Sequence, residues 1–245
     1  MSDPVKLQAA MQSVSACLVL SPVDPQQCQL QDNIVSAALA EGDVYIVKIS
    51  GLGTALDSYV DSGRWHAETE QKIIRSGLPH TLLRPLFFMQ NLGFQLQSAR
   101  ADGLIRSAVT RHPINMVDAD DIGDVVAELL SSRSKLLGEA VPLTGPEPLS
   151  YVQMAEIFSQ VLQRPVVFQE QTFAEVEQAL QQSDQPTWHT RILMQFNRAL
   201  NEGWGDVTLP IVNQVLGRQP RSFLSYLTRV TSEKPTDQGR DPFPS

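Results

Sequence analysis

The sequence predicts an α/β protein with a parallel sheet, because strand-like and helix-like segments alternate with short connections in its first third. Three apolar runs, ACLVLS (16–21), VYIVKIS (44–50) and HTLLRP (80–85), have the length and composition of strands buried on both faces. Amphipathic segments between them supply crossover helices. Strand–helix–strand units this short form right-handed crossovers and therefore parallel strands.

The helices of this half have recognisable ends. Asp3 followed by Pro4 is a typical helix start, with an N-cap residue and a proline in the first turn. The second helix stops at Gly42 and the third, RWHAETEQKIIRSG, stops at Gly77. Their apolar faces fall at helical spacing: Leu30, Ile34, Ala37 and Ala38 in the second helix, and Trp65, Thr69 and Ile73 in the third.

The carboxyl half is predicted to be mainly helical. A helix capped by Asp118 or Asp120 carries apolar residues at helical spacing, and two capping-box patterns each open a further helix. The elements expected here are the capping boxes Ser150–Gln153 and Thr172–Glu175, helices over 187–200 and 222–230, and short strands near 114–117 and 166–168. We therefore expect an α/β domain over 1–110, mainly helical elements over 111–231 with the strand near 114–117 available to return to the sheet, and a disordered tail over 232–245.

Composition narrows the classes of partner. The chain has 245 residues, 42% of them apolar, and a net charge of −8. This charge and the scattered Lys and Arg residues argue against nucleic acid, whose binding needs clustered positive charge. No apolar run has the length of a membrane span, and the two cysteines lack metal-ligand spacing. We expect a cytoplasmic protein with a small-molecule substrate, without nucleic-acid, membrane or metal binding.

The stretch VYIVKISGLGTAL imitates a phosphate-binding glycine turn but departs from its requirements. Such a turn needs a third glycine or alanine, where this chain has Leu56, and a helix that opens at once. Here turn-forming residues follow, and the next helix begins only near Gly63. We interpret the stretch as a strand that ends in a glycine-rich loop.

A more specific match comes from an ordered series of segments. KISGLG, GRWHAETEQKIIRSGLPHTLLRPLFFMQNL, VDADDIGDVVAELL and PLTGPEPLSYVQMAEIFSQVLQRPV together resemble the NmrA-like family of atypical short-chain dehydrogenase/reductase relatives. The resemblance implies part of a Rossmann-type parallel sheet that binds NAD(P), followed by a smaller, mostly helical substrate domain. In that reading the runs 16–21, 44–50 and 80–85 are the fourth, fifth and sixth strands of the sheet.

The family's glycine-rich phosphate loop follows a first strand for which this chain shows no counterpart, so roughly 60 residues of the pattern are missing. We therefore expect a truncated NAD(P)-binding domain with weak or absent NAD(P) binding by this chain alone. The strand 16–21 would then form an apolar sheet edge, which predicts self-association or pairing with a partner.

Candidate site residues lie where the predicted strands end, because ligands of parallel sheets bind beyond the carboxyl ends of the strands. The cofactor-binding candidates at these ends are Ser21, Pro22, Ser50, Gly51, Pro85, Leu86 and Phe87. Ser50 is also a catalytic candidate that could hydrogen-bond a substrate carbonyl, with bonding to turn backbone as the alternative.

The resemblance also implies a role for His66, the second catalytic candidate and a further cofactor-binding one. Counting from Glu70, His66 falls where related reductases carry the lysine of a Tyr-Lys pair, and Ser62 falls where they carry the tyrosine. A serine hydroxyl is a poor acid, so His66 would hold the nicotinamide ribose or donate a proton. The alternative is a solvated or capped helix histidine. Phe88 and Asn91, after the third run, are substrate candidates, with core packing as the alternative for both Phe87 and Phe88.

Three functions follow as hypotheses. The first is an NAD(P)-dependent reductase that transfers hydride to a quinone-like or carbonyl acceptor, impaired by the missing loop. The second is a non-catalytic NAD(P)-sensing or partner-binding regulator, and the third is an inactive or unstable truncated product. Turnover of NADPH with quinones would distinguish the first from the others.

Overall fold

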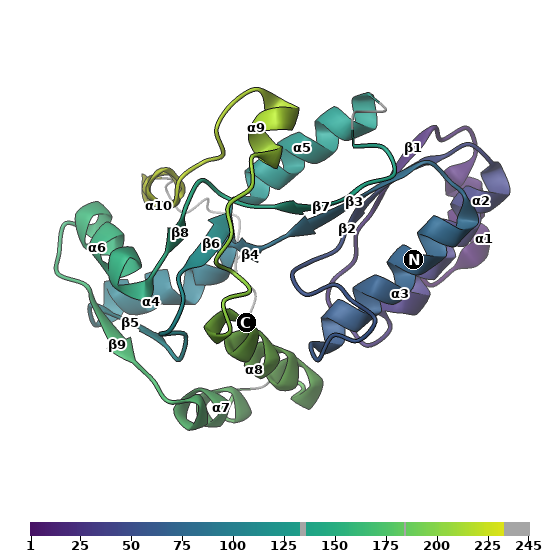
Figure 1. Ribbon diagram of the computed structural model, residues 1–245. Coiled ribbons are helices and arrows are strands. Elements are labelled where there is room, and N and C mark those ends of the chain that lie inside the picture. Colours follow the sequence, from purple (N-terminus) through teal and green to yellow (C-terminus); the bar gives the residue numbers. More distant parts are fainter. Residues whose placement is uncertain (133–135, 184, 233–245) are drawn as a thin grey trace.

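The computed structural model describes residues 1–132, 136–183 and 185–232 of the chain. Its largest sheet has four parallel strands in the order β1-β2-β3-β7 (Figure 1). The strands are β1 (Ala16–Val19), β2 (Tyr45–Ile49), β3 (His80–Pro85) and β7 (Ala140–Leu143). The first three are the predicted runs, and the predicted α/β class with a parallel sheet is confirmed.

Helices cover both faces of this sheet (Figure 1). One face packs on α1 (Pro4–Met11), α2 (Gln27–Glu41) and α3 (Asp61–Ser76), and the other packs on α5 (Ala119–Ser131) and α9 (Ile211–Leu216). Because side chains alternate along a strand, Ile46 of β2 joins the first core and Val47 joins the second. This alternation places Lys48, the next residue, on the α2–α3 face.

The other part of the molecule has its own core, centred on the fully buried Phe158. Two small sheets, β4-β6-β8 and β5-β9, lie in this part. Their strands are β4 (Phe87–Phe88), β5 (Leu104–Ser107), β6 (Ile114–Val117), β8 (Pro148–Leu149) and β9 (Val167–Glu170). The helical elements here are η1 (Met89–Leu92), α4 (Gly93–Ala101), α6 (Tyr151–Leu162), α7 (Phe173–Gln181), α8 (Thr187–Asn201) and α10 (Phe223–Ser232).

The structure corrects the expected place of the strand at 114–117. This strand, β6, pairs with β4 and β8, and it is β7 that returns to the large sheet beside β3. The sequence does not predict β7, because its segment AVPL contains a proline, which is unusual in a strand. Pro142 is accommodated since β7 is an edge strand of this sheet.

The two chain ends bear on two further predictions. Among the described strands, β1 pairs with β2 alone, so it forms the opposite edge of the sheet; pairing of this edge with another chain stays a prediction. Ser232 is the last residue of α10, and the rest of the predicted disordered tail lies outside the described residues.

Within the described part of the chain, no helix has both the length and the apolar composition needed to cross a bilayer.

Candidate functional site

A buried polar cluster lies between the large sheet and helices α2 and α3. Lys48 of β2 is fully buried, and its ammonium donates to Nδ1 of His66 (3.0 Å) and to the Ile49 carbonyl (3.2 Å). Gln27, also fully buried, places its side-chain nitrogen 2.9 Å from the same Nδ1 of His66. The cluster therefore joins β2, the second strand of the sheet, to helices α2 and α3.

These contacts determine the protonation of His66. A lysine ammonium can only donate hydrogen bonds, so Nδ1 of His66 must accept, and the ring proton lies on Nε2. Burial, and then the positive charge of Lys48, hold the pKa of His66 well below its ordinary value. Burial also lowers the pKa of Lys48 to about 8. At neutral pH, His66 is therefore a neutral imidazole whose Nε2–H finds no acceptor among the described residues.

A second cluster holds the end of β2 to β3. The Ser50 hydroxyl donates to Glu70 Oε1 (2.6 Å), and Arg84 donates to both carboxylate oxygens of Glu70, with Nε at 3.1 Å from Oε1. Glu70 is buried and fully partnered by this two-pronged ion pair. The Ser50 proton is thus committed to Glu70. This disfavours both interpretations made from the sequence, a bond to substrate and a bond to turn backbone.

The glycines after β2 make room for side chains and backbone of this protein. Gly53 has a positive φ of 74°, and a Cβ on it would lie 2.3 Å from the Trp204 ring. Gly63, in the first turn of α3, lies so close to the loop that a Cβ on it would be 2.4 Å from the Gly53 carbonyl oxygen. Both glycines are needed for packing, which agrees with our interpretation that this loop is not a phosphate turn.

A cavity of about 530 Å³, the strand-end cavity, opens at the carboxyl ends of β2 and β3. Its wall includes Gly51, Tyr59, Arg84, Leu86 and Trp204. His66 lies behind this wall: a Cβ on Gly51 would be 3.7 Å from His66 Nε2. The location is the usual ligand position of a parallel sheet, and the volume is that of a small-molecule site.

The structure brings some of the predicted residues together and separates others. Gly51 and Leu86 line the strand-end cavity, while Ser50, His66 and the buried Pro85 lie directly behind or beside lining residues. The remaining candidates lie elsewhere. Ser21 accepts a hydrogen bond from Gln31, and Pro22, after the end of β1, is exposed. Phe87 and Phe88 are half-buried in β4 and pack on two different cores, and Asn91 is exposed in η1. Their proposed contacts with cofactor or substrate stay predictions.

Several residues of this site were not singled out from the sequence. Lys48 had a visible signal, since it is the lone charge in the apolar run VYIVKIS, and a lysine there must be buried with a partner. Gln27, Tyr59 and Trp204 had no such signal. Trp204 in particular reaches Gly53 from the far end of the chain, and no local pattern announces that contact.

Comparison with known proteins defines the class to which this fold and site belong. The model of the NmrA-like family matches residues 1–210. The chain is 30% identical over 224 residues to the NAD(P)H azoreductase of Xenophilus azovorans, an alignment that covers 91% of this chain and 78% of that protein. The chain belongs to the NmrA-like family, as the ordered series of motifs predicted.

Other similar proteins agree with this assignment. The chain is 27% identical to the (4-alkanoyl-5-oxo-2,5-dihydrofuran-3-yl)methyl phosphate reductase of Streptomyces griseus, over 91% of this chain and 78% of that one. Among solved structures, the NADPH-dependent quinone oxidoreductase of Escherichia coli, in complex with NADPH, superposes with a TM-score of 0.85 at 21% identity, covering 94% of this chain and 81% of that chain. The triphenylmethane reductase of Citrobacter superposes with a TM-score of 0.77 at 21% identity, covering 93% and 80%. These structures establish the Rossmann-like fold.

Proposed function

We propose that the chain is an NAD(P)H-dependent oxidoreductase that reduces a planar quinone-like, azo or carbonyl acceptor. Membership of the NmrA-like family supports this proposal, as does the name of the relative from Xenophilus azovorans, an NAD(P)H azoreductase. The single observation that carries it is the strand-end cavity with the uncommitted Nε2–H of His66 behind Gly51.

The geometry supports a role for His66 as a hydrogen-bond donor. Its depressed pKa keeps imidazolium scarce at neutral pH, so the ring acts as a neutral donor. A neutral imidazole can still stabilise negative charge that develops on an acceptor oxygen or nitrogen. Lys48 and Gln27 are positioning residues, because they hold Nδ1 as an acceptor and thereby keep the proton on Nε2.

The residues present fit the nicotinamide half of a dinucleotide. Gly51 and Leu86 line the cavity at the ends of β2 and β3, and these backbone positions would contact a bound nicotinamide. A bound NAD(P)H would supply the hydride, and the chain's own residues would orient the acceptor and polarise it.

The pyrophosphate half fits less well. A glycine turn that opens a helix directly from a strand end is the usual cradle for these phosphates. Here α2 begins at Gln27, well after β1 ends at Val19, and α3 begins at Asp61, well after β2 ends at Ile49. Within the described residues, neither β1 nor β2 passes directly through a glycine turn into its helix. We therefore propose that this chain alone binds NAD(P)H weakly.

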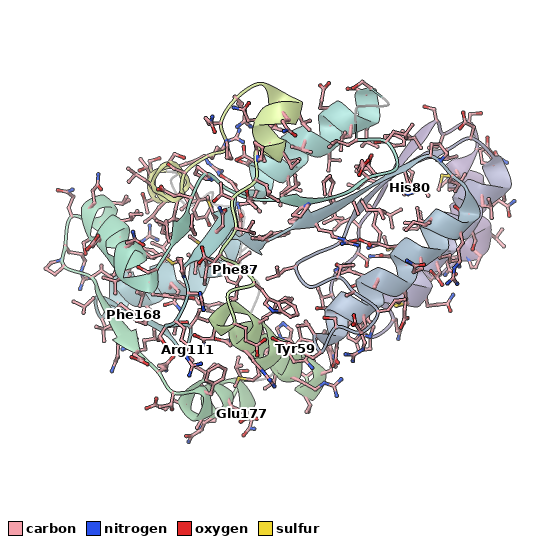
Figure 2. The ribbon with its side chains drawn as sticks, viewed as in Figure 1. Tyr59, His80, Phe87, Arg111, Phe168 and Glu177 are labelled. Carbon is pink, nitrogen blue, oxygen red and sulfur yellow. The ribbon has the colours of Figure 1, made fainter. Side chains whose placement is uncertain are left out.

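The activity is tested by following NADPH oxidation with a naphthoquinone and with an azo dye. We expect turnover by the wild-type chain, and we expect His66→Leu, which has no side-chain donor, to lower kcat by roughly 10²–10³-fold, the usual effect of losing one charge-stabilising donor. His80→Leu is the matched control, because His80 lies at the start of β3, remote from the cavity, and bonds the Leu78 carbonyl (Figure 2). Absence of turnover with every acceptor, or equal losses in both variants, would contradict the proposal and favour the non-catalytic alternatives.

Weak cofactor binding is tested separately by isothermal titration of the chain with NADPH. We expect a dissociation constant well above the micromolar range, since neither β1 nor β2 leads directly into a helix start that could hold the phosphates. Micromolar affinity would show that another part of the chain binds the pyrophosphate, and the proposal of weak binding would then be wrong.

A further inference from the structure

A neutral imidazole such as His66 is a good hydrogen-bond donor but, by itself, a poor source of a proton. Loss of the Nε2 proton alone would leave an imidazolate anion, and burial disfavours a charge of this kind. The loss becomes favourable when Nδ1 gains a proton in the same step, because the ring then stays neutral. Proton donation from His66 to an acceptor therefore needs a second group that gives a proton to Nδ1.

Lys48 is placed to give that proton. It is fully buried, and its ammonium already donates to Nδ1 of His66 at 3.0 Å. Gln27, the other described partner of Nδ1, is a neutral amide and keeps its protons at neutral pH. Lys48 gives up a proton more readily than an ordinary lysine, because burial lowers its pKa to about 8.

The charged and titratable groups that surround Lys48 come from three elements. Glu70 of α3 and Arg84 of β3 act on the pKa of Lys48 with opposite signs and are ion-paired with each other. On α2, burial and then the hydrogen bond to Glu68 raise the pKa of Cys28 to about 12, so this thiol is neutral near pH 8. A change of charge near pH 8 in this cluster is therefore assigned to Lys48.

We propose that Lys48 and His66 form a proton relay to the strand-end cavity. When the acceptor has received its hydride, the Nε2–H bond of His66 breaks and the proton bonds to the acceptor oxygen or nitrogen. In the same step one N–H bond of the Lys48 ammonium breaks, and that proton bonds to Nδ1. Both side chains are then neutral, and after product release a proton from water returns by the reverse route.

This inference rests on the proposed function, in which reduced nicotinamide supplies the hydride. Lys48 stays a positioning residue, because it acts through His66. The relay route ends at Gly51, which lines the cavity and has no side chain to separate it from Nε2 of His66.

The relay is tested first without cofactor, by the nitrogen chemical shifts of the His66 ring as the pH is raised through 8. Once Lys48 is a neutral amine it can accept a hydrogen bond from Nδ1–H, so the ring form with its proton on Nδ1 becomes populated. We expect the His66 shifts of the wild type to change with a midpoint near pH 8, and those of Lys48→Met to stay constant. Constant shifts in the wild type would overturn the relay.

The second measurement compares two acceptors in the presence of NADPH. A naphthoquinone takes up a proton together with the hydride, whereas the carbocation of a cationic triphenylmethane dye takes up the hydride alone. At pH 7, Lys48→Met should lower kcat for the quinone by about 10²-fold, the lower end of the effect of general acid catalysis, and leave kcat for the dye within about threefold of wild type. Above pH 8, kcat of the wild type for the quinone should fall about tenfold per pH unit, and that of Lys48→Met should not.

Two further variants separate the relay from simple positioning of the ring. Gln27→Leu removes the neutral donor to Nδ1 and keeps the ammonium, so it should retain the decline of kcat above pH 8. Lys72→Met, at a partly exposed lysine of α3, should behave as wild type with both acceptors. Equal losses for quinone and dye in Lys48→Met, or a pH profile equal to that of wild type, would overturn the relay and leave the proposed function standing. Absence of turnover by a wild-type chain whose His66 shifts do change near pH 8 would refute the proposed function alone.

Discussion

Gly63→Ala is expected to lower the free energy of unfolding by about 1–3 kcal/mol, the usual cost of forcing one methyl group into a filled space. The added Cβ would meet the Gly53 carbonyl oxygen at 2.4 Å and the Ser58 hydroxyl at 2.8 Å, and the first of these is backbone that cannot rotate away. Urea unfolding, with the midpoint and slope compared to wild type, measures the loss.

The same substitution should also impair the site. Moving Gly53 away from α3 displaces the loop that lines the strand-end cavity and its contact with Trp204. We therefore expect kcat/KM for the acceptor to fall together with stability.

Gly123→Ala is the matched control for this pair of effects. Gly123 also lies inside a helix, α5, but a Cβ there meets nothing within 4 Å. Alanine is the better helix former, so this variant should gain up to about 1 kcal/mol and keep its activity. If Gly63→Ala behaved like Gly123→Ala, the close approach of α3 to the loop would not exist in solution.

Local patterns were sufficient where one segment determines its own structure. The capping boxes at Ser150 and Thr172 open α6 and α7 as predicted, and Gly77 ends α3 with the left-handed backbone that favours glycine. The parallel strands were predictable for the same reason, because a short segment that is apolar on both faces is compatible with few elements other than a strand buried on both faces. Such features depend on residues only a few positions apart.

The candidate site was predicted only in part, because it depends on contacts between distant segments. The strand-end rule placed Gly51 and Leu86 correctly at the cavity, yet it could not show that Ser50 is committed to Glu70. The Tyr-Lys comparison directed attention to His66 and away from Lys48, which lies in a different element. Only the packing of β2 against α3 shows that Lys48 and His66 are hydrogen-bonded to each other.

Lys48→Met is expected to increase stability at neutral pH while it impairs activity. Burial lowers the pKa of Lys48 from its ordinary value of 10.5 to about 8, so the folded protein incurs a cost of about 3 kcal/mol to keep this ammonium charged at pH 7. Methionine has no charge to bury. The variant, however, leaves Gln27 as the one described partner of His66 Nδ1. The Gln27 amide can donate to Nδ1 or, when rotated, accept from Nδ1–H, so the ring proton is no longer fixed on Nε2.

The pH dependence of unfolding identifies Lys48 as the cause. Between pH 8 and 10.5 the unfolded lysine holds its proton while the folded one has lost it, so the free energy of unfolding of the wild type should rise with pH relative to the variant. The difference between the two curves removes contributions from other groups that titrate in this range. Over this window the advantage of Lys48→Met should shrink by about 3 kcal/mol.

Lys72→Met provides the control, because Lys72 lies on α3 with a partly exposed side chain and pairs with Asp32 at 3.2 Å. Its curve should stay within about 0.5 kcal/mol of wild type across the same range. Nitrogen chemical shifts of His66 in the three proteins report which ring nitrogen carries the proton. Two results together would contradict this account: His66 in Lys48→Met keeps its proton on Nε2, and the free energy of unfolding of this variant changes with pH between 8 and 10.5 as that of wild type does. The inferred burial of a charged lysine against His66 would then be wrong. The same result would remove the reason for assigning His66 a fixed donor proton at this site.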